Sequence, residues 1–165
     1  MTVKRSRFSS LLVAPVLLAA SLASMPAAWG TEPVHTERNA AMNVLHSFTD
    51  RASDLAIRAM ALVGIRYQYG GNTPEHGLDC SGLVRYVFKQ AWGAELPRTS
   101  EEISRVGAKV DSSDLQPGDL VFFYSPISHV GIYIGGGHMI DAPYTGTVVQ
   151  IHPVYWNLFA GAARP

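Results

Sequence analysis

The sequence has little cysteine, no excess of charge of either sign and no long apolar segment. Each of these features argues against a particular kind of site or partner. Cys80 is the only cysteine among 165 residues, which excludes an internal disulfide and any metal or redox site built on a pair of cysteines. Thirteen basic and thirteen acidic side chains give a net charge of zero, so electrostatics predict neither nucleic acid nor an anionic membrane as partner. Apolar residues make up 47% of the chain, which is enough for the core of one domain.

The first thirty residues have the pattern of a secretory signal peptide. A basic start is followed by an apolar run, residues 11–23, that is too short to span a bilayer comfortably. Small residues precede Thr31, and cleavage there or one or two residues earlier predicts a periplasmic or secreted protein. The alternative is an uncleaved membrane anchor. No cysteine lies directly after the apolar run to accept a lipid.

The rest of the chain changes character near its middle. Residues 31–51 are mixed and polar, typical of a linker or a helical arm, and residues 52–165 form the predicted domain. Helical spacing comes first, at residues 53–64, 80–93 and 99–107, the last opened by a capping box. Short turn-linked strands follow, at residues 120–124, 130–134, 138–142, 147–151 and 158–163. This order predicts an α+β fold, with N-terminal helices packed on a C-terminal antiparallel sheet.

Cys80 occupies a position that favours a reactive thiol. Asp79 is expected to cap a helix that begins at Cys80, and Leu78 and Leu83 fit a hydrophobic staple across the cap. The positive end of the helix dipole favours a thiolate over a thiol at this position. The alternative is that Cys80 is a small buried hydrophobic residue without chemistry.

A nucleophilic cysteine needs a base, and His129 is the best placed of the six histidines. His129 opens a strand directly after a loop, at the rim of the sheet, where catalytic groups often lie on rigid scaffolds. The alternative is a hydrogen-bonded histidine with a structural role. The remaining histidines are expected to be solvated, structural or at the edge of a substrate groove, and these are His35, His46, His76, His138 and His152.

The third member of the site follows from the geometry of the next hairpin. A three-residue turn at residues 135–137 would place Ile134 opposite His138 and Gly131 opposite Asp141. Side chains alternate faces along a strand, so Asp141 would share a face with His129 and could orient its imidazole. A turn one residue shorter or longer would bring in His138 instead.

Five short sequence motifs resemble those of a known protein family. They are YQYGG at residues 67–71, LDCSGLV at 78–84, LPRTS at 96–100, LQPGDLVFF at 115–123 and HVGIYIG at 129–135. In this order they resemble the NlpC/P60 cysteine peptidases, over nearly the whole chain from about Ala52. The resemblance implies a papain-like fold and hydrolysis of peptidoglycan stem peptides, commonly between γ-D-glutamate and a diamino acid.

The resemblance also implies roles for single residues. It matches Cys80 to the nucleophile, His129 to the base and Asp141 to the third polar position, where the family more often has histidine or asparagine. It further matches four residues to the substrate groove and the binding of the peptide's N-terminal end, namely Tyr69, Asp79, Ser81 and Arg98. Each of these four also has a structural interpretation, as a core aromatic residue, as helix caps or as a surface ion pair.

The predicted protein is therefore a monomeric cell-wall endopeptidase that needs no metal or organic cofactor. Its oxyanion would be stabilised by the Cys80 N–H and by a donor from the loop at residues 69–71. One rival is an amidase or acyltransferase on the same scaffold, because thiol chemistry suits any acyl transfer. A second rival is a wall-binding or regulatory module without activity.

Overall fold

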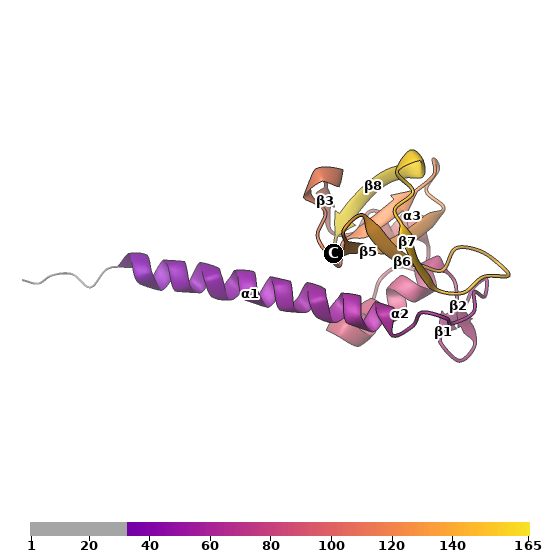
Figure 1. Ribbon diagram of the computed structural model, residues 1–165, viewed down its shortest axis with the longest axis horizontal. Coiled ribbons are helices and arrows are strands. Elements are labelled where there is room, and N and C mark those ends of the chain that lie inside the picture. Colours follow the sequence, from indigo (N-terminus) through magenta and orange to yellow (C-terminus); the bar gives the residue numbers. More distant parts are fainter. Residues whose placement is uncertain (1–32) are drawn as a thin grey trace, which may run out of the picture. The chain divides into compact units, whose positions relative to one another are not determined.

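The computed structural model describes residues 33–165, apart from the side chains of residues 33–41, 44, 45, 47 and 48. The predicted signal peptide, residues 1–30, lies outside the described residues. Residues 34–165 form one compact unit. Its helices, labelled in Figure 1, are α1 (Pro33–Met60), α2 (Cys80–Trp92) and α3 (Ser100–Ile103), with short 3-10 helices at Ser112–Asp114 and Trp156–Leu158.

Helix α1 is longer than the sequence pattern predicted. The segment expected to be a linker or a helical arm is helical from Pro33 onwards, because no glycine and no further proline interrupts residues 34–60 and proline suits the first helical position. Near its end, Leu55 and Ala59 are fully buried, and they join the main core with Leu62 from the following turn. Among the described helices, none combines the length and apolar character needed to cross a membrane.

The strands form a two-stranded hairpin and a six-stranded sheet, and every pair between neighbouring strands is antiparallel. The order in the larger sheet is β3-β8-β4-β5-β6-β7. The hairpin is β1 (Asn72–Thr73) with β2 (Gly77–Leu78), and the sheet contains β3 (Ala108–Val110), β4 (Leu120–Phe123), β5 (His129–Gly135), β6 (His138–Asp141), β7 (Gln150–Pro153) and β8 (Phe159–Arg164). The α+β class with an antiparallel sheet is confirmed.

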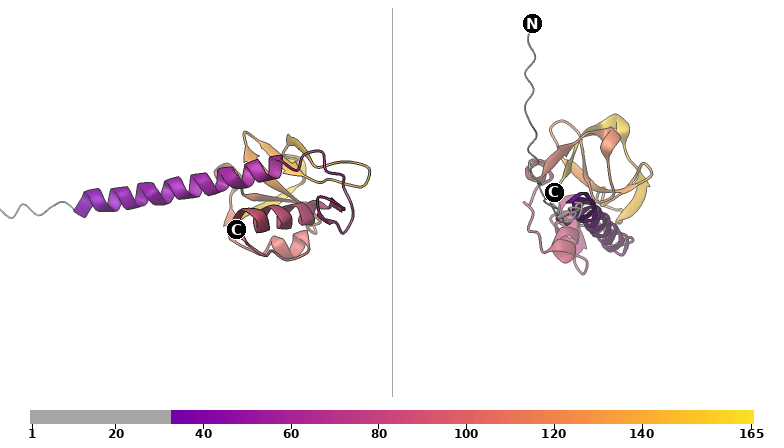
Figure 2. Two further views of the ribbon diagram at one scale, coloured as in Figure 1. Left: turned by 90° about the horizontal axis from the view of Figure 1, so that it is seen from below. Right: turned by 90° about the vertical axis from the view of Figure 1, so that its left-hand side faces the viewer.

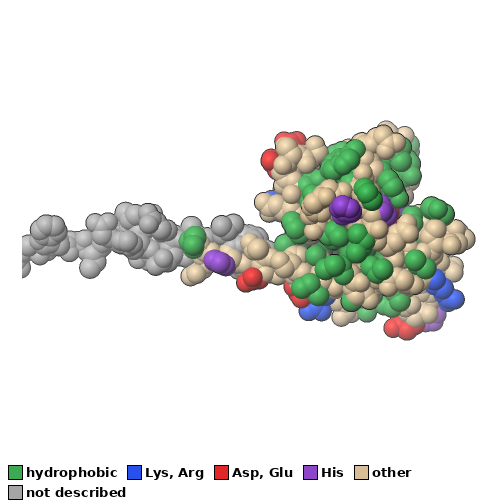
Figure 3. Space-filling view, in the orientation of Figure 1, with side chains coloured by type: hydrophobic (Ala, Val, Ile, Leu, Met, Phe, Trp, Pro, Cys, Tyr) green, Lys and Arg blue, Asp and Glu red, His purple; other side chains and the backbone are tan. Residues whose placement is uncertain are grey.

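The sheet separates two apolar clusters, which explains why β4 is buried along its whole length. Alternate β4 residues, Leu120 and Phe122, face the cluster that contains α2, whereas Val121 and Phe123 face the second cluster. Figures 1 and 2 show α2 against one side of the sheet. On the face shown in Figure 3, hydrophobic side chains gather over the folded part, with histidine side chains among them.

The turn between β5 and β6 differs from the predicted one. Gly135, not Ile134, lies opposite His138, and the register is irregular between Tyr133 and Gly135. Gly135, Gly136 and Gly137 have φ values of 99°, 59° and 75°, a region that glycine enters without strain, so the chain forms a tighter turn with a bulge before it. Beyond the bulge Ile132 lies opposite Ile140, which is the register that the three-residue turn had predicted.

Candidate active site

Helix α2 begins at Cys80 as the sequence predicted. Asp79 has extended backbone angles, and its side chain accepts a hydrogen bond of 2.7 Å from the Gly82 N–H. Leu78 and Leu83, on either side of the cap, are fully buried, as the staple requires. The half-buried Cys80 therefore lies at the positive end of a 13-residue helix.

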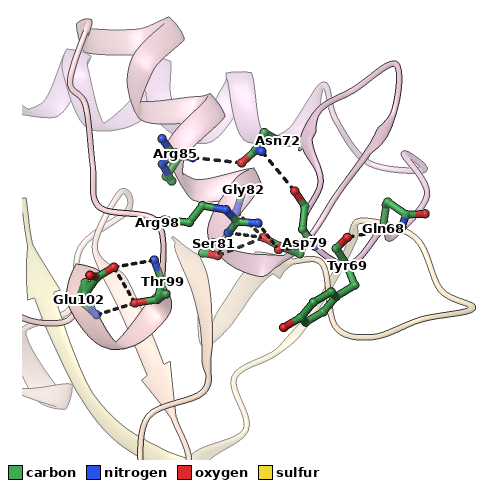
Figure 4. Close-up of polar contacts among 11 residues, drawn as sticks. Gln68, Tyr69, Asn72, Asp79, Ser81, Gly82, Arg85, Arg98, Thr99 and Glu102 are labelled. Atoms are coloured by element: carbon green, nitrogen blue, oxygen red, sulfur yellow. Dashed lines mark hydrogen bonds and ion pairs between the residues drawn. The ribbon is translucent and has the colours of Figure 1, made fainter.

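Asp79 has a second role beside its cap, as the centre of a polar cluster (Figure 4). Arg98 donates to both of its oxygens, at 3.2 Å and 2.6 Å, and also to the Ser81 hydroxyl at 2.6 Å. With the Gly70 and Gly82 N–H groups and the Ser81 hydroxyl, five donors surround the carboxylate. Burial raises the pKa of Asp79, but these hydrogen bonds and the charge of Arg98 outweigh it and lower the pKa.

The loop before α2 approaches the helix closely. A Cβ at Gly82 would lie 1.9 Å from the Gly71 carbonyl oxygen, so only glycine permits this contact. The contact leaves little freedom to the loop, and two of its N–H groups are occupied, since Gly70 donates to Asp79 and Gly71 donates to the Gln68 carbonyl. These two N–H groups are therefore not available as oxyanion donors, and the expectation of a donor from residues 69–71 stays a prediction for the Tyr69 N–H alone. Tyr69, in the same loop, has 83% of its surface exposed.

His129 is the first residue of β5, an interior strand of the sheet, and it is buried. Its Nε2 lies 2.6 Å from Oδ2 of Asp141, which leaves Nδ1 as the nitrogen for the hydrogen bond with Cys80. Burial lowers the pKa of His129, but the hydrogen bonds and negative charges of Asp141 and Cys80 outweigh it and raise the pKa from 6.5 to about 9. The imidazole is thus protonated at neutral pH, as a thiolate–imidazolium pair requires.

Asp141 ends β6 and is fully buried. Its two oxygens contact two histidines on either side, His129 at 2.6 Å and His152 on β7 at 2.7 Å. His138, the alternative third residue, is exposed and contacts the Gly136 carbonyl at 2.9 Å. The structure thus brings Cys80, His129 and Asp141 together and leaves His138 outside.

His152 is the site residue that the sequence analysis missed. The fourth predicted strand ended at residue 151, whereas β7 runs from Gln150 to Pro153 and pairs His152 with Met139. Side chains alternate along a strand, so Met139 and Asp141 share a face and His152 lies diagonal to Asp141. A strand placed two residues later would have revealed this neighbour.

A cavity of about 300 Å³ adjoins His129 on the side formed by the chain segments after β4, β6 and β7. Its lining is mostly aromatic and carries no lysine, arginine or carboxylate: Tyr124, Ser128, His129, Pro143, Tyr144, Tyr155 and Leu158. Tyr124 has a φ of 72°, which is unusual for a residue with a side chain. The cavity is large enough to hold one amino-acid residue beside the imidazole.

The polar groups around Asp141 do not form a metal site. Within the described part of the chain, no group of three or more histidine, cysteine or acidic side chains could hold a metal ion. The arrangement brings together a thiol, an imidazole and a buried carboxylate, which are the kinds of group that acyl transfer by a thiol uses.

Comparison with known proteins shows which family the chain belongs to. The sequence model of the NlpC/P60 family matches residues 64–162. A gamma-DL-glutamyl hydrolase of Bacillus subtilis is 45% identical over 101 residues, which cover 58% of this chain and 24% of that protein. Murein DD-endopeptidase MepH of Escherichia coli is 39% identical over 117 residues, 65% of this chain and 43% of that protein. The chain thus spans less than half the length of these two relatives.

Solved structures show the same fold. The NlpC/p60 domain of the peptidoglycan hydrolase SagA is 34% identical, with a TM-score of 0.65, and the match covers 69% of this chain and 98% of that one. The resuscitation promoting factor interacting protein RipA, mutated at a histidine, is 30% identical with a TM-score of 0.64, over 70% of this chain and 62% of that one. Further structures of RipA carry mutations at a cysteine and at a glutamate.

Proposed function

The chain belongs to the NlpC/P60 family, and from this membership and the site geometry we propose that it is a cysteine peptidase that hydrolyses peptidoglycan stem peptides through Cys80, His129 and Asp141. One observation carries the proposal. Asp141 holds His129 by Nε2 at 2.6 Å, and Cys80 interacts with the same ring and helps raise its pKa to about 9. A histidine with only a structural role would need neither the buried carboxylate nor the thiol.

The spacing of the three residues supports their roles. His129 follows Cys80 by 49 residues, and Asp141 follows His129 by 12. The mutated cysteine, histidine and glutamate of RipA have the same two separations. This agreement supports Asp141 as the third member of the site, since the residue at the same separation in that protein is also a carboxylic acid.

The proposed mechanism is acyl transfer through a thioester. The Cys80 thiolate attacks the amide carbonyl, the protonated His129 gives its proton to the leaving amine, and water then releases the acyl group with His129 as base. Asp141 fixes the ring and stabilises the imidazolium throughout.

Two donors are proposed for the oxyanion. The Cys80 N–H is in the first turn of α2, where backbone N–H groups have no acceptor within the helix. The second is the hydroxyl of Tyr67, a half-buried residue packed against the main core. Burial raises the pKa of Tyr67, and the charge of Cys80 raises it further, so this hydroxyl stays protonated near the thiol.

The substrate is proposed to lie across Cys80 between two walls. On one side are Tyr69 and the cluster of Asp79, Ser81 and Arg98, proposed to hold the N-terminal part of the peptide. Asp79 already has five donors, so a peptide amine would compete with Arg98 for it. On the other side is the tyrosine-lined cavity, proposed to hold the leaving diamino acid.

The proposed bond is the one between γ-D-glutamate and the diamino acid. The relatives carry names for two different bonds, a glutamyl hydrolase and a DD-endopeptidase, and the two bonds release different fragments. We therefore propose digestion of purified peptidoglycan, with mass spectrometry of the soluble products, and Cys80→Ser as the matched control. Fragments that end in glutamate support the proposal, whereas cleavage of cross-links between stems would assign the other bond.

The same experiment separates the rivals. An amidase would release intact stems from glycan, and an acyltransferase would join an added amine to the peptide. A wall-binding module would sediment with peptidoglycan and leave its composition unchanged. The buried hydrogen bond between His129 and Asp141 favours a catalytic site over a wall-binding module.

The proposed location is the periplasm or the medium, where the substrate lies. The proposal rests on the signal-like pattern of residues 1–30 and cleavage near Thr31. N-terminal sequencing of the protein isolated from cells tests it, since an uncleaved chain would begin at Met1.

A further inference from the structure

Asp141 uses its second oxygen in a contact that the proposed mechanism does not need. Oδ1 lies 2.7 Å from Nε2 of His152, while Oδ2 lies 2.6 Å from Nε2 of His129. His152 is largely buried, with 14% of its side chain exposed. The three residues stand on adjacent strands, β5, β6 and β7, on one face of the sheet.

The contacts of His152 define which of its nitrogens carry protons. Nδ1 lies 2.8 Å from the Pro153 carbonyl oxygen, which can only accept a hydrogen bond. Nε2 faces the Asp141 carboxylate, which also only accepts when it is ionised. A neutral imidazole has one N–H and would leave one of these contacts between two acceptors. The imidazolium, with two N–H groups, satisfies both.

We infer that His152 is a positioning residue, which as an imidazolium donates to Oδ1 of Asp141 and thereby fixes Oδ2 against the catalytic His129. The inference rests on the proposed function, because it assigns His152 a part in the same site. Among the contacts of the described residues, those of His152 are with Pro153, Asp141 and Tyr155, so it acts on His129 through Asp141.

The charges around Asp141 support this role. A thiolate, an imidazolium and a carboxylate together carry one net negative charge, and burying an uncompensated charge is costly. Asp141 is completely buried, so the positive charge of His152 makes the four groups neutral together. The charge-assisted hydrogen bond from His152 also holds the carboxylate in the orientation in which Oδ2 faces His129.

Tyr155 holds the ring of His152 in place. The two rings are stacked, with centroids 4.4 Å apart and planes 22° apart, and the Tyr155 hydroxyl lies 3.2 Å from Nε2. Tyr155 also lines the cavity beside His129, together with Tyr124 and Tyr144. The titratable groups that face His152 directly are therefore Asp141 and Tyr155.

The test compares three variants of the full chain. His152→Phe keeps a flat ring for Tyr155 and removes both N–H donors. His152→Gln keeps one amide donor that can reach Asp141. His138→Gln, on the neighbouring strand, is the matched control, because His138 is exposed and bonds only the Gly136 carbonyl among the described contacts. Circular dichroism and thermal melting establish that each variant is folded.

Two readouts are measured for each variant. The first is kcat and KM on a stem peptide. We expect His152→Phe to lower kcat about tenfold with KM within twofold, and His152→Gln to recover most of the loss, to within about threefold of wild type. The control should stay within twofold of wild type.

The second readout is the pH profile of Cys80 alkylation by iodoacetamide, which needs no substrate. Removal of a positive charge near the site disfavours the thiolate, so His152→Phe should move the low-pH limb upwards by about half a pH unit or more. A purely structural role would change the melting temperature and leave this limb in place.

The inference is overturned if folded His152→Phe keeps wild-type kcat and an unshifted alkylation profile. It is also overturned if folded His152→Gln recovers none of the kcat that His152→Phe loses. Failure of the proposed function looks different, because a wild-type protein without wall activity would still show whether the alkylation profile depends on His152.

Discussion

Arg98 holds both oxygens of the Asp79 carboxylate, Oδ1 at 3.2 Å and Oδ2 at 2.6 Å, although 19 residues separate the two in the chain. The same carboxylate caps α2 through the Gly82 N–H and fixes the Gly70 N–H of the preceding loop. One side chain thus ties the start of α2, and with it the backbone of Cys80, to two loops.

Asp79→Asn is expected to lower the free energy of unfolding at neutral pH by about 1–2 kcal/mol. Asparagine still caps a helix, so the loss reflects mainly the partly exposed ion pair with Arg98. The folded-state pKa of Asp79 is lowered below 3.8, so this stabilisation is present above that pH and is lost as the pH falls through the folded-state pKa. Urea unfolding at pH 7 and pH 3 measures it.

The control for this prediction is Asp54→Asn. Asp54 pairs with Arg58 on the surface of α1, where both side chains are well exposed, so the change should lower the stability much less than Asp79→Asn at neutral pH. Equal losses for the two variants would show that the Asp79 cluster adds nothing beyond a surface ion pair.

Cys80 is expected to react with iodoacetamide about tenfold faster at pH 6 than a model thiol, because the pKa of His129 is raised to about 9 and the imidazolium favours the thiolate beside it. Cys80 is the only thiol, so the mass shift reports on it alone. His129→Ala should slow the reaction to the rate of the model thiol. A wild-type rate no greater than that of free cysteine would remove the basis for a nucleophile.

The stability of the protein is expected to fall between about pH 6.5 and pH 9. The pKa of His129 is raised from 6.5 to about 9 on folding, so its stabilisation is fully present below pH 6.5 and is lost as the pH rises through 9. The size is at most on the order of 3 kcal/mol. Urea unfolding across this range measures it, and His129→Gln should give a flatter pH dependence. Parallel curves for the two proteins would contradict the assignment.

Asp141→Ala is expected to lower kcat on a stem peptide by about 10–1,000-fold, because the imidazole loses its orienting carboxylate and its stabilising charge. Asp141→Asn should retain more activity, since its amide oxygen still accepts from His129. His138→Ala should change kcat less than twofold. An inactive His138→Ala together with an active Asp141→Ala would show that the wrong residue has been assigned.

Much of this site could be predicted from local sequence because local forces decide it. The cap at Asp79, the start of α2 at Cys80 and the capping box at Thr99 depend on a few adjacent residues, and the structure has all three. The placement of Asp141 beside His129 was also predictable, because alternation along two strands joined by a short turn has few solutions. The exact turn was not predictable, since three consecutive glycines allow several turns and only the sheet register selects one.

The sequence by itself determined the fold class, the nucleophile helix and the family, because periodicity, capping residues and five ordered motifs all lie within short stretches of chain. Only the tertiary structure decided which groups surround Asp141 and Asp79. His152 reaches Asp141 through the pairing of β6 with β7, and Arg98 reaches Asp79 across 19 residues. Such contacts depend on strand ends and on loop paths, which are fixed by packing in the whole domain rather than by the residues next to them.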